Sequence, residues 1–216
     1  MLNDGEKGVV IQRDKVTYAI APHMPCGLVT AAQLRKIADV ADRFGAAVKV
    51  TSAQRIAIVG LREEQVDAAW AELGMSPAGL TGLCVRSIKV CPGTSFCKRG
   101  LQDSLDIGQE LDRLYHGLPT PGKMKLGVSG CPNQCGETNF RDIGLVGSAH
   151  GWKLLVGGNG GGKARIGECV AEGLTKDQAL AAVAKVVAYF VANAKPHERL
   201  GRVIERLGID ALKAAL

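Results

Sequence analysis

The chain has 216 residues, of which 46% are hydrophobic, and carries seven cysteines and a formal net charge of +6. This length allows one substantial core or two small domains. The longest apolar stretch, residues 179–191, is interrupted by Lys185, and the N-terminal residues form no apolar signal segment, so we expect neither a spanning helix nor a secretion signal. Aromatic residues make up only 4% and basic residues are scattered, so we expect no nucleic-acid binding.

The first part of the chain predicts alternating strands and helices. Thr30 can cap a helix that ends at Gly45. Its apolar face is expected to comprise Leu34, Ile37, Ala38, Ala41 and Phe44. A second helix is expected over 62–73, and the expected strands cover residues 16–23, 47–51, 55–61 and 87–90. The order β-α-β-β-α-β is that of a ferredoxin-like α+β unit.

The second part differs in composition, with strands expected at 123–128 and 152–156. Helices are expected at 98–115, 175–194 and 198–216. Residues 157–163 are a glycine tract, which is either a flexible linker or a loop that faces a ligand.

Four cysteines form two closely spaced pairs, Cys91-x5-Cys97 and Cys131-x3-Cys135, each beginning with Cys-Pro. Four thiolates suit either Zn²⁺ or an iron–sulfur cluster, although zinc ribbons prefer a Cys-x2-Cys spacing. The alternative is four buried, reduced cysteines that act as small apolar residues. Clustered cysteines without a secretion signal indicate metal binding or catalysis in a reducing cytoplasm.

The cysteine pattern, with Gly130-Cys-Pro-Asn-Gln-Cys135 as its second half, resembles the sulfite and nitrite reductases that contain sirohaem and a [4Fe–4S] cluster. The resemblance extends over nearly the whole chain, through residues 24–30 and 48–54, the glycine tract and the segment 197–202. It implies an α+β fold, with a ferredoxin-like half-domain over residues 1–76 followed by an α/β module for sirohaem and cluster over 77–216.

The resemblance also implies roles for individual residues. The four paired cysteines would hold the cluster, and Cys135 would also ligate the sirohaem iron. The residues implied to bind and protonate the anionic substrate are Arg86, Lys123, Lys125 and His23. Those implied to contact the cofactors are Thr51, Gln54, Arg55, Asn133, Gln134, Gly158, Gly160, Gly161, Lys163 and Arg165.

Two positions depart from the family's pattern. His23 and Ala53 stand where basic residues are common, and Lys49 or Arg55 is a candidate replacement for the missing charge. Both departures bear on turnover and substrate choice more than on cluster binding. Cys26, Cys84 and Cys169 fall outside the pattern and are interpreted as structural.

The implied reaction is the six-electron reduction of sulfite to sulfide by a cytoplasmic enzyme. Nitrite reduction to ammonia is an alternative reaction that uses the same cofactors. Two alternatives from other classes are a [4Fe–4S] electron carrier without sirohaem and a zinc-stabilised nucleic-acid module. The glycine tract lacks the strand and helix context of a dinucleotide site, so we expect electrons to come from a separate donor protein. Lys125 and Cys131 lie far apart along an extended strand, which favours a homodimer whose two copies share their sites.

Overall fold

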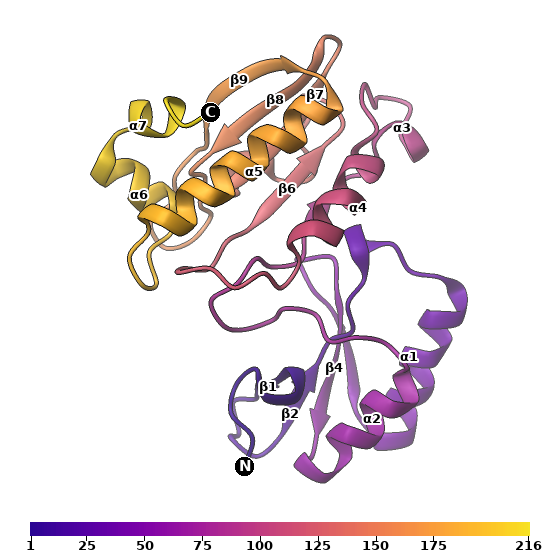
Figure 1. Ribbon diagram of the computed structural model, residues 1–216. Helices are drawn as coiled ribbons and strands as arrows, with labels where there is room; N and C mark the ends of the chain where they lie inside the picture. The colour runs from indigo at the N-terminus through magenta and orange to yellow at the C-terminus, as the bar shows by residue number, and fades with distance from the viewer. The chain divides into compact units, whose positions relative to one another are not determined.

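A computed structural model describes residues 1–216, which form two units, Met1–Gly82 and Leu83–Leu216 (Figure 1). The division falls later than the predicted boundary at residue 76. Segment 76–78 still belongs to the first unit, because His23 N donates to Ser76 O and Ala78 N donates to Ala21 O. Two backbone hydrogen bonds therefore attach the end of this segment to the first sheet.

The first unit is a four-stranded antiparallel sheet with two helices packed beside it (Figure 1). Its strands, in spatial order, are β1 (Val9–Ile11), β2 (Tyr18–Ile20), β4 (Ile56–Leu61) and β3 (Ala47–Val50). The helices are α1 (Ala31–Phe44) and α2 (Val66–Leu73), with short 3-10 turns η1 (Glu6–Gly8), η2 (Pro25–Gly27) and η3 (Glu63–Gln65). Tyr18, Ile20, Ile37, Ile58 and Leu61 are at most 2% exposed and form the centre of its core.

The capping prediction for α1 is confirmed in detail. Thr30 accepts a hydrogen bond from Gln33 N, Gln33 reaches back to the Thr30 backbone, and Gly45 ends the helix with φ +63°. The predicted apolar face is wrong in two of its members: Leu34 and Ala38 are exposed, and Val40 is buried in their place. The helix turns the face of Ile37, Val40 and Ala41 toward the sheet, at the i, i+3, i+4 spacing.

The strand predicted over 87–90 does not close the first sheet. It is β5 (Lys89–Val90), which pairs with a strand of the second unit, and the missed strand β1 takes the edge position instead. Val9, Val10 and Ile11 are three consecutive β-branched residues, so the signal for β1 was present in the sequence.

The second unit is built on a five-stranded mixed sheet in the order β5, β6 (Leu126–Ser129), β7 (Ile143–Ser148), β8 (Gly151–Val156), β9 (Glu168–Leu174). The first three strands are parallel and the last three antiparallel. Helices α4 (Ser104–Tyr115) and α5 (Lys176–Asn193) pack on the sheet and against each other, and α6 (Leu200–Leu207) and α7 (Ile209–Lys213) follow (Figure 1). No helix combines the length and the apolar character needed to cross a membrane.

Three predictions for this unit need correction. The helix expected over 98–115 begins only at Ser104, because Asp103 caps it by accepting from Leu105 N and Asp106 N, and a short helix α3 (Gly93–Phe96) precedes it. Strands β7 and β9 were not predicted. The last helix is interrupted at Gly208, where φ is +85°.

Glycines on β6 and β7 leave part of one face of the second sheet without side chains. Successive side chains on a strand point to opposite faces, so Leu126 and Val128 point one way and Gly127 and Ser129 the other. Gly127 pairs with Gly144 on β7, and a Cβ at Gly144 would lie 2.5 Å from Thr138 O. The segment that connects β6 to β7, which includes the turn η4 (Thr138–Phe140), therefore lies directly on this glycine face.

Candidate metal centre and anion site

Two of the paired cysteines emerge at the same edge of the second sheet. Val90 pairs with Val128 in the parallel β5–β6 ladder, and Cys91 N donates to Val128 O at 3.1 Å. Cys91 thus follows the carboxyl end of β5, and Cys131 follows that of β6. Because the carboxyl ends of parallel strands meet at one edge, two sequence-distant thiols are brought to the same place.

The two cysteine loops are held together by backbone packing between glycines. A Cβ at Gly130 would lie 2.8 Å from Gly93 Cα, and a Cβ at Gly100 would lie 2.5 Å from the Gly93 carbonyl carbon. Gly130 O accepts hydrogen bonds from Leu101 N and Gln102 N at 2.8 and 3.0 Å. Any larger residue at these positions would push the loops apart.

A backbone donor is aimed at one of the thiols. Gly130 N donates to Cys91 Sγ at 3.1 Å, and Ser104 Oγ lies 3.5 Å from the same sulfur. Hydrogen bonds to sulfur stabilise a thiolate and adjust the reduction potential of an iron–sulfur cluster. This donor set fits a thiolate-bound inorganic group.

The four cysteines differ in exposure: Cys91 and Cys131 are buried, Cys97 is half-buried and Cys135 is exposed. None of the seven cysteines is in a disulfide. No group of three or more His, Cys, Asp or Glu side chains converges closely enough to hold a single metal ion. Four cysteine thiolates match the ligand set of a [4Fe–4S] cluster, in which each iron takes one thiolate.

Asn133, Gln134 and Cys135 lie in the connection between β6 and β7. Gln134 has φ +51°, its N–H donates to Cys131 O, and its Oε1 accepts from Thr138 Oγ1 at 2.7 Å. Gly136 N then donates to Ser129 Oγ at 2.9 Å, on the glycine face of the sheet. Gln134 therefore shapes the loop that presents Cys135, whereas the Asn133 side chain is exposed.

The predicted cations Arg86, Lys123 and Lys125 come together at the opposite edge of the sheet. Arg86 N donates to Met124 O at 2.9 Å, which places Arg86 beside the residue that the two lysines flank. Burial lowers the pKa of Lys125, and repulsion from Lys123, Arg141 and Arg199 lowers it further. Burial likewise lowers the pKa of Arg86. Arg141 and Arg199 are thus two members of this cation cluster that sequence reasoning missed.

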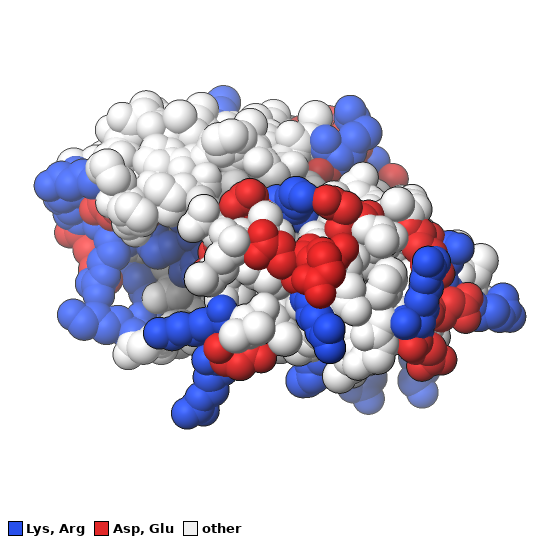
Figure 2. Space-filling model, turned by 90° about the horizontal axis from the view of Figure 1, so that it is seen from below, with Lys and Arg blue, Asp and Glu red and all other residues white.

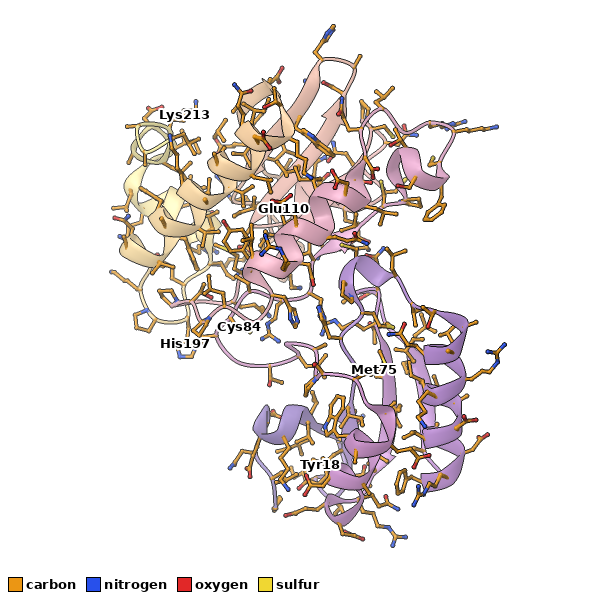
Figure 3. All side chains as sticks on the ribbon, turned by 45° about the vertical axis from the view of Figure 1, so that its right-hand side comes forward. Tyr18, Met75, Cys84, Glu110, His197 and Lys213 are labelled. Carbon is orange, nitrogen blue, oxygen red and sulfur yellow. The ribbon has the colours of Figure 1, made fainter.

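The loops around the cation cluster carry two of the residues labelled in Figure 3. Met124 N donates to Cys84 O, and His197 N donates to Pro121 O at 2.8 Å. Figure 3 shows Cys84 and His197 at the same end of the second unit, with Lys213 of α7 away from them. On the face drawn in Figure 2, Lys and Arg lie in separate groups among Asp and Glu.

A buried ion pair organises this edge. Asp142 is 1% exposed, and its carboxylate accepts from Arg199 Nε at 2.9 Å and Arg199 Nη2 at 2.7 Å. The same carboxylate accepts from Lys125 N at 2.7 Å, and Arg199 Nη1 reaches Asn159 Oδ1 at 3.3 Å. Burial raises the pKa of Asp142, and Arg199 opposes that shift. One bidentate pair thus joins β6, β7, the glycine tract and the start of α6.

Two buried donors near the cations have no hydrogen-bond partner, namely Arg141 Nε and Ser87 Oγ. Another nitrogen of the same guanidinium is engaged, because Arg141 Nη2 donates to Glu137 Oε2 at 2.7 Å. Buried polar groups are almost always hydrogen-bonded, so an unsatisfied guanidinium N–H within a cation cluster is suited to an anionic ligand. The residues present therefore fit both a carboxylate-bearing cofactor and a small oxyanion.

The glycine tract closes on itself beside this cluster. Asn159 and Arg165 exchange backbone hydrogen bonds at 2.8 Å, and Arg165 Nη1 donates to Gly157 O at 2.9 Å. A Cβ at Gly158 would lie 2.3 Å from Asn139 O, whereas Gly160 and Gly161 are exposed, and a Cβ at Gly161 would lie 3.3 Å from Asn159 Oδ1. A pocket of about 20 Å³ here is lined by Asn159, Lys163, Arg165, Arg199, Gly201, Arg202 and Glu205. Gly158 is thus required by packing, and Lys163 remains exposed.

The other predicted site residues belong to the first unit. Thr51 and Arg55 close the turn between β3 and β4, where Thr51 N donates to Arg55 O at 2.8 Å. Gln54 occupies this turn with φ +56°, and a Cβ at Gly27 would lie 3.0 Å from its Cβ. The turn that follows His23 and the β3–β4 turn therefore lie together within this unit.

The comparison with protein families decides the identity. Residues 81–216 match the model of the nitrite and sulphite reductase 4Fe-4S domain, and residues 10–76 match the nitrite/sulfite reductase ferredoxin-like half domain. The chain belongs to the nitrite and sulfite reductase family. The family resemblance, the fold class and the assignment as a sirohaem-dependent oxidoreductase are confirmed, and the predicted cofactors, a [4Fe–4S] cluster and sirohaem, are those of the family.

Individual relatives show how much of each protein the chain covers. It is 43% identical over 216 residues to an assimilatory-type sulfite reductase of Nitratidesulfovibrio vulgaris, covering 100% of this chain and 99% of the relative. It is 37% identical over 207 residues to a nitrite reductase [NAD(P)H] of Bacillus subtilis, covering 95% of this chain but 26% of that protein. The chain thus spans about a quarter of this nitrite reductase.

Two solved structures share the fold. Dissimilatory sulfite reductase I matches with a TM-score of 0.83 and 17% identity, over 92% of this chain and 68% of the other. The NirA protein of Mycobacterium tuberculosis matches with a TM-score of 0.79 and 20% identity, over 98% and 43% of the two chains. At these identities the likeness concerns the fold alone.

The Asp142–Arg199 pair generates a stability prediction. Asp142→Asn should lower the free energy of unfolding by about 3 kcal/mol, because it leaves the partly buried Arg199 without its counter-ion. Urea unfolding followed by circular dichroism measures the change. Asp177→Asn, at an exposed position of α5, is the control and should change little. Equal stability of the two variants would contradict an organising role for the pair.

Proposed function

We propose that this enzyme reduces sulfite to sulfide in a six-electron reaction, with Cys91, Cys97, Cys131 and Cys135 as ligands of the [4Fe–4S] cluster. The observation that carries the proposal is the pairing of two features in one unit. A loop pair with an N–H donor aimed at Cys91 Sγ lies at one edge of the sheet, and a cation cluster with unsatisfied donors lies at the other. Full-length similarity to an assimilatory-type sulfite reductase favours sulfite as the substrate.

The cofactors supply electron transfer and an iron that binds the substrate, and the chain supplies charge and protons. Arg86, Lys123 and Lys125 neutralise the anion. Burial and the neighbouring cations lower the pKa of Lys125, which makes its ammonium group a stronger acid and suits it to donate a proton. Arg141 Nε and Ser87 Oγ offer further donors to cofactor carboxylates or to the oxyanion.

Nitrite reduction to ammonia is the second candidate. Nitrite is also a small oxyanion, and the cation cluster contains nothing that selects between the two. The similarity to a nitrite reductase [NAD(P)H] over 95% of this chain supports it. Steady-state turnover with each anion under the same reductant separates the two candidates.

Electrons come from a separate protein, since the glycine tract closes on its own backbone and does not lead from a strand into a helix as a dinucleotide loop does. The enzyme works in the cytoplasm, where reducing conditions keep the cluster thiols available. The family resemblance further assigns substrate and sirohaem contacts to His23, Thr51, Gln54 and Arg55. It assigns cofactor contacts to Asn133, Gly158, Gly160, Gly161, Lys163 and Arg165.

The cluster ligands are tested by exchange of single cysteines. Cys97→Ser should lose iron and acid-labile sulfide and much of the folded protein, because binding energy at a metal site is also folding energy. Cys26→Ser, at a buried cysteine outside the pairs, is the matched control and should keep its iron. The measurement is iron and sulfide content per chain. Equal iron loss in both variants would show that the ligand assignment is wrong.

Removal of the Lys125 charge tests whether this lysine acts in catalysis or only in cofactor binding and folding. Lys125→Met should keep both chromophores in the visible spectrum but lower kcat with sulfite by about a hundredfold, as loss of a charged donor to a reacting oxyanion does. Lys36→Met, on the exposed face of α1, is the matched control. Sulfite kinetics that are unchanged by Lys125→Met would remove this lysine from the site.

We also propose that a homodimer joins the cysteines of one copy to the cations of the other. β6 stays extended through Gly127, which pairs with Lys89 and Gly144, so Lys125 and Cys131 are roughly 20 Å apart along the strand. The test mixes a Lys123→Met/Lys125→Met chain with a Cys135→Ser chain, each inactive alone, under conditions of subunit exchange. Partial recovery of activity is expected. Full activity of a protein that sediments as a monomer would rule the dimer out.

A further inference from the structure

A carboxylate in the middle of the β6–β7 connection bridges two cations from different segments. Glu137 Oε1 accepts from Lys89 Nζ at 2.6 Å, and Glu137 Oε2 accepts from Arg141 Nη2 at 2.7 Å. Lys89 lies on β5, two residues before Cys91. Glu137 lies two residues after Cys135. We call Lys89, Glu137 and Arg141 the Glu137 bridge; it connects two segments that carry proposed cluster ligands.

The Glu137 bridge lies over the part of the second sheet that has no side chains. Lys89 pairs with Gly127 in the β5–β6 ladder, so its side chain points to the same face as that glycine. A Cβ at Gly127 would lie 2.7 Å from Arg141 Cγ. The absence of a side chain at Gly127 therefore makes room for Arg141 on the face to which Lys89 points.

The Glu137 bridge differs in burial from the exposed ion pairs of the same unit. The side chains of Lys89 and Arg141 are 13% and 12% exposed, whereas that of Lys153, which pairs with Glu172, is 38% exposed. Exposed pairs contribute little to stability because water screens them. Two cations that are mostly buried require a counter-charge, and Glu137 supplies it to both.

The backbone of Glu137 has a conformation that favours glycine, with φ +55° and ψ 37°. The loop imposes this conformation, because Glu137 N donates to Gln134 O at 2.8 Å and Glu137 O accepts from Phe140 N at 3.0 Å. A residue that stays strained where glycine would fit indicates a role for its side chain. The contacts of that side chain indicate that it holds the loop that follows Cys135.

We propose that Glu137 is a positioning residue that holds the Cys135 loop against β5 and so fixes the separation of Cys135 from Cys91. The inference rests on the proposed function, because it takes both cysteines as cluster ligands. The hydrogen bond from Lys89 reaches β5, whereas the Gln134–Thr138 bond stays within the connection. Because Cys135 is exposed, loss of the bridge would let this ligand move away from the cluster.

The test measures how fast the holoenzyme releases iron to a ferrous chelator, followed by the absorbance of the iron–chelator complex. Glu137→Gln and Lys89→Met should each speed release about tenfold, since loss of a group that orients a metal ligand weakens metal binding by about this much. The double variant should be about as fast as either single variant, because both remove the same contact. Lys89→Arg, which keeps the charge, should release iron at the native rate. Glu172→Gln, in an exposed pair on β9, is the matched control and should also keep the native rate.

An effect of charge alone would give a different pattern. Glu137→Gln removes a negative charge and Lys89→Met a positive one, so a purely electrostatic role would shift the reduction potential of the cluster in opposite directions and leave iron release unchanged. Native release rates in Glu137→Gln would overturn the proposal, as would equal acceleration in Glu172→Gln. Failure of the proposed function is distinguishable, because the native enzyme would then reduce neither sulfite nor nitrite while its iron release is still measured.

Discussion

The second unit depends on a buried carboxylate. Asp142 is 1% exposed, and an ionised carboxylate at that depth is tolerated only with full pairing. Its partners come from distant parts of the chain: the Arg199 guanidinium and the Lys125 backbone N–H, with Asn159 bonded in turn to Arg199. Pairing of the Asp142 carboxylate therefore fixes the position of Lys125 at the start of β6. It also fixes the position of Asn159 in the glycine tract. The cations lie close together, despite their mutual repulsion, because this acid lies among them.

Glycine is the second constraint, and it acts through the absence of side chains. Parallel strands are usually joined by a helix that covers a sheet face. Here the connection from β6 to β7 is an irregular segment, and it lies on the sheet because Gly127 and Gly144 leave room for it. At the edge of the sheet, Gly93, Gly100 and Gly130 let the two cysteine loops meet backbone to backbone. The glycines on the sheet face and those at the sheet edge are therefore both needed to bring the thiols into place.

Local sequence patterns predicted individual helices and strands better than they predicted which of these elements pack together. The Thr30 cap and the Gly45 stop are short-range patterns, and each predicted a feature that the structure contains. β5 was assigned to the wrong sheet because a strand of two residues has no sequence pattern that indicates which strand it pairs with. The Asp142–Arg199 pair was missed for a similar reason, since its residues lie 57 positions apart and each alone is typical of a solvated charge. The one indication in the sequence that Asp142 is buried was its position directly before the apolar run Ile143-Gly-Leu-Val146.

The connection between β6 and β7 joins the edge of the sheet that carries the proposed metal ligands to the edge that carries the cation cluster. It begins with Cys131 at the carboxyl edge of the sheet and ends with Arg141 and Asp142 at the amino edge, among the cations. Glu137, between them, accepts from both Lys89 and Arg141, and the hydrogen bond from Lys89 holds its pKa below the usual range. A segment that is packed on glycine, paired at its middle and buried at its end cannot move one end independently of the other. Proposed metal ligands and proposed anion-binding groups are therefore kept in a fixed relation by the same stretch of chain, so a change in packing at Gly144 would be felt at both.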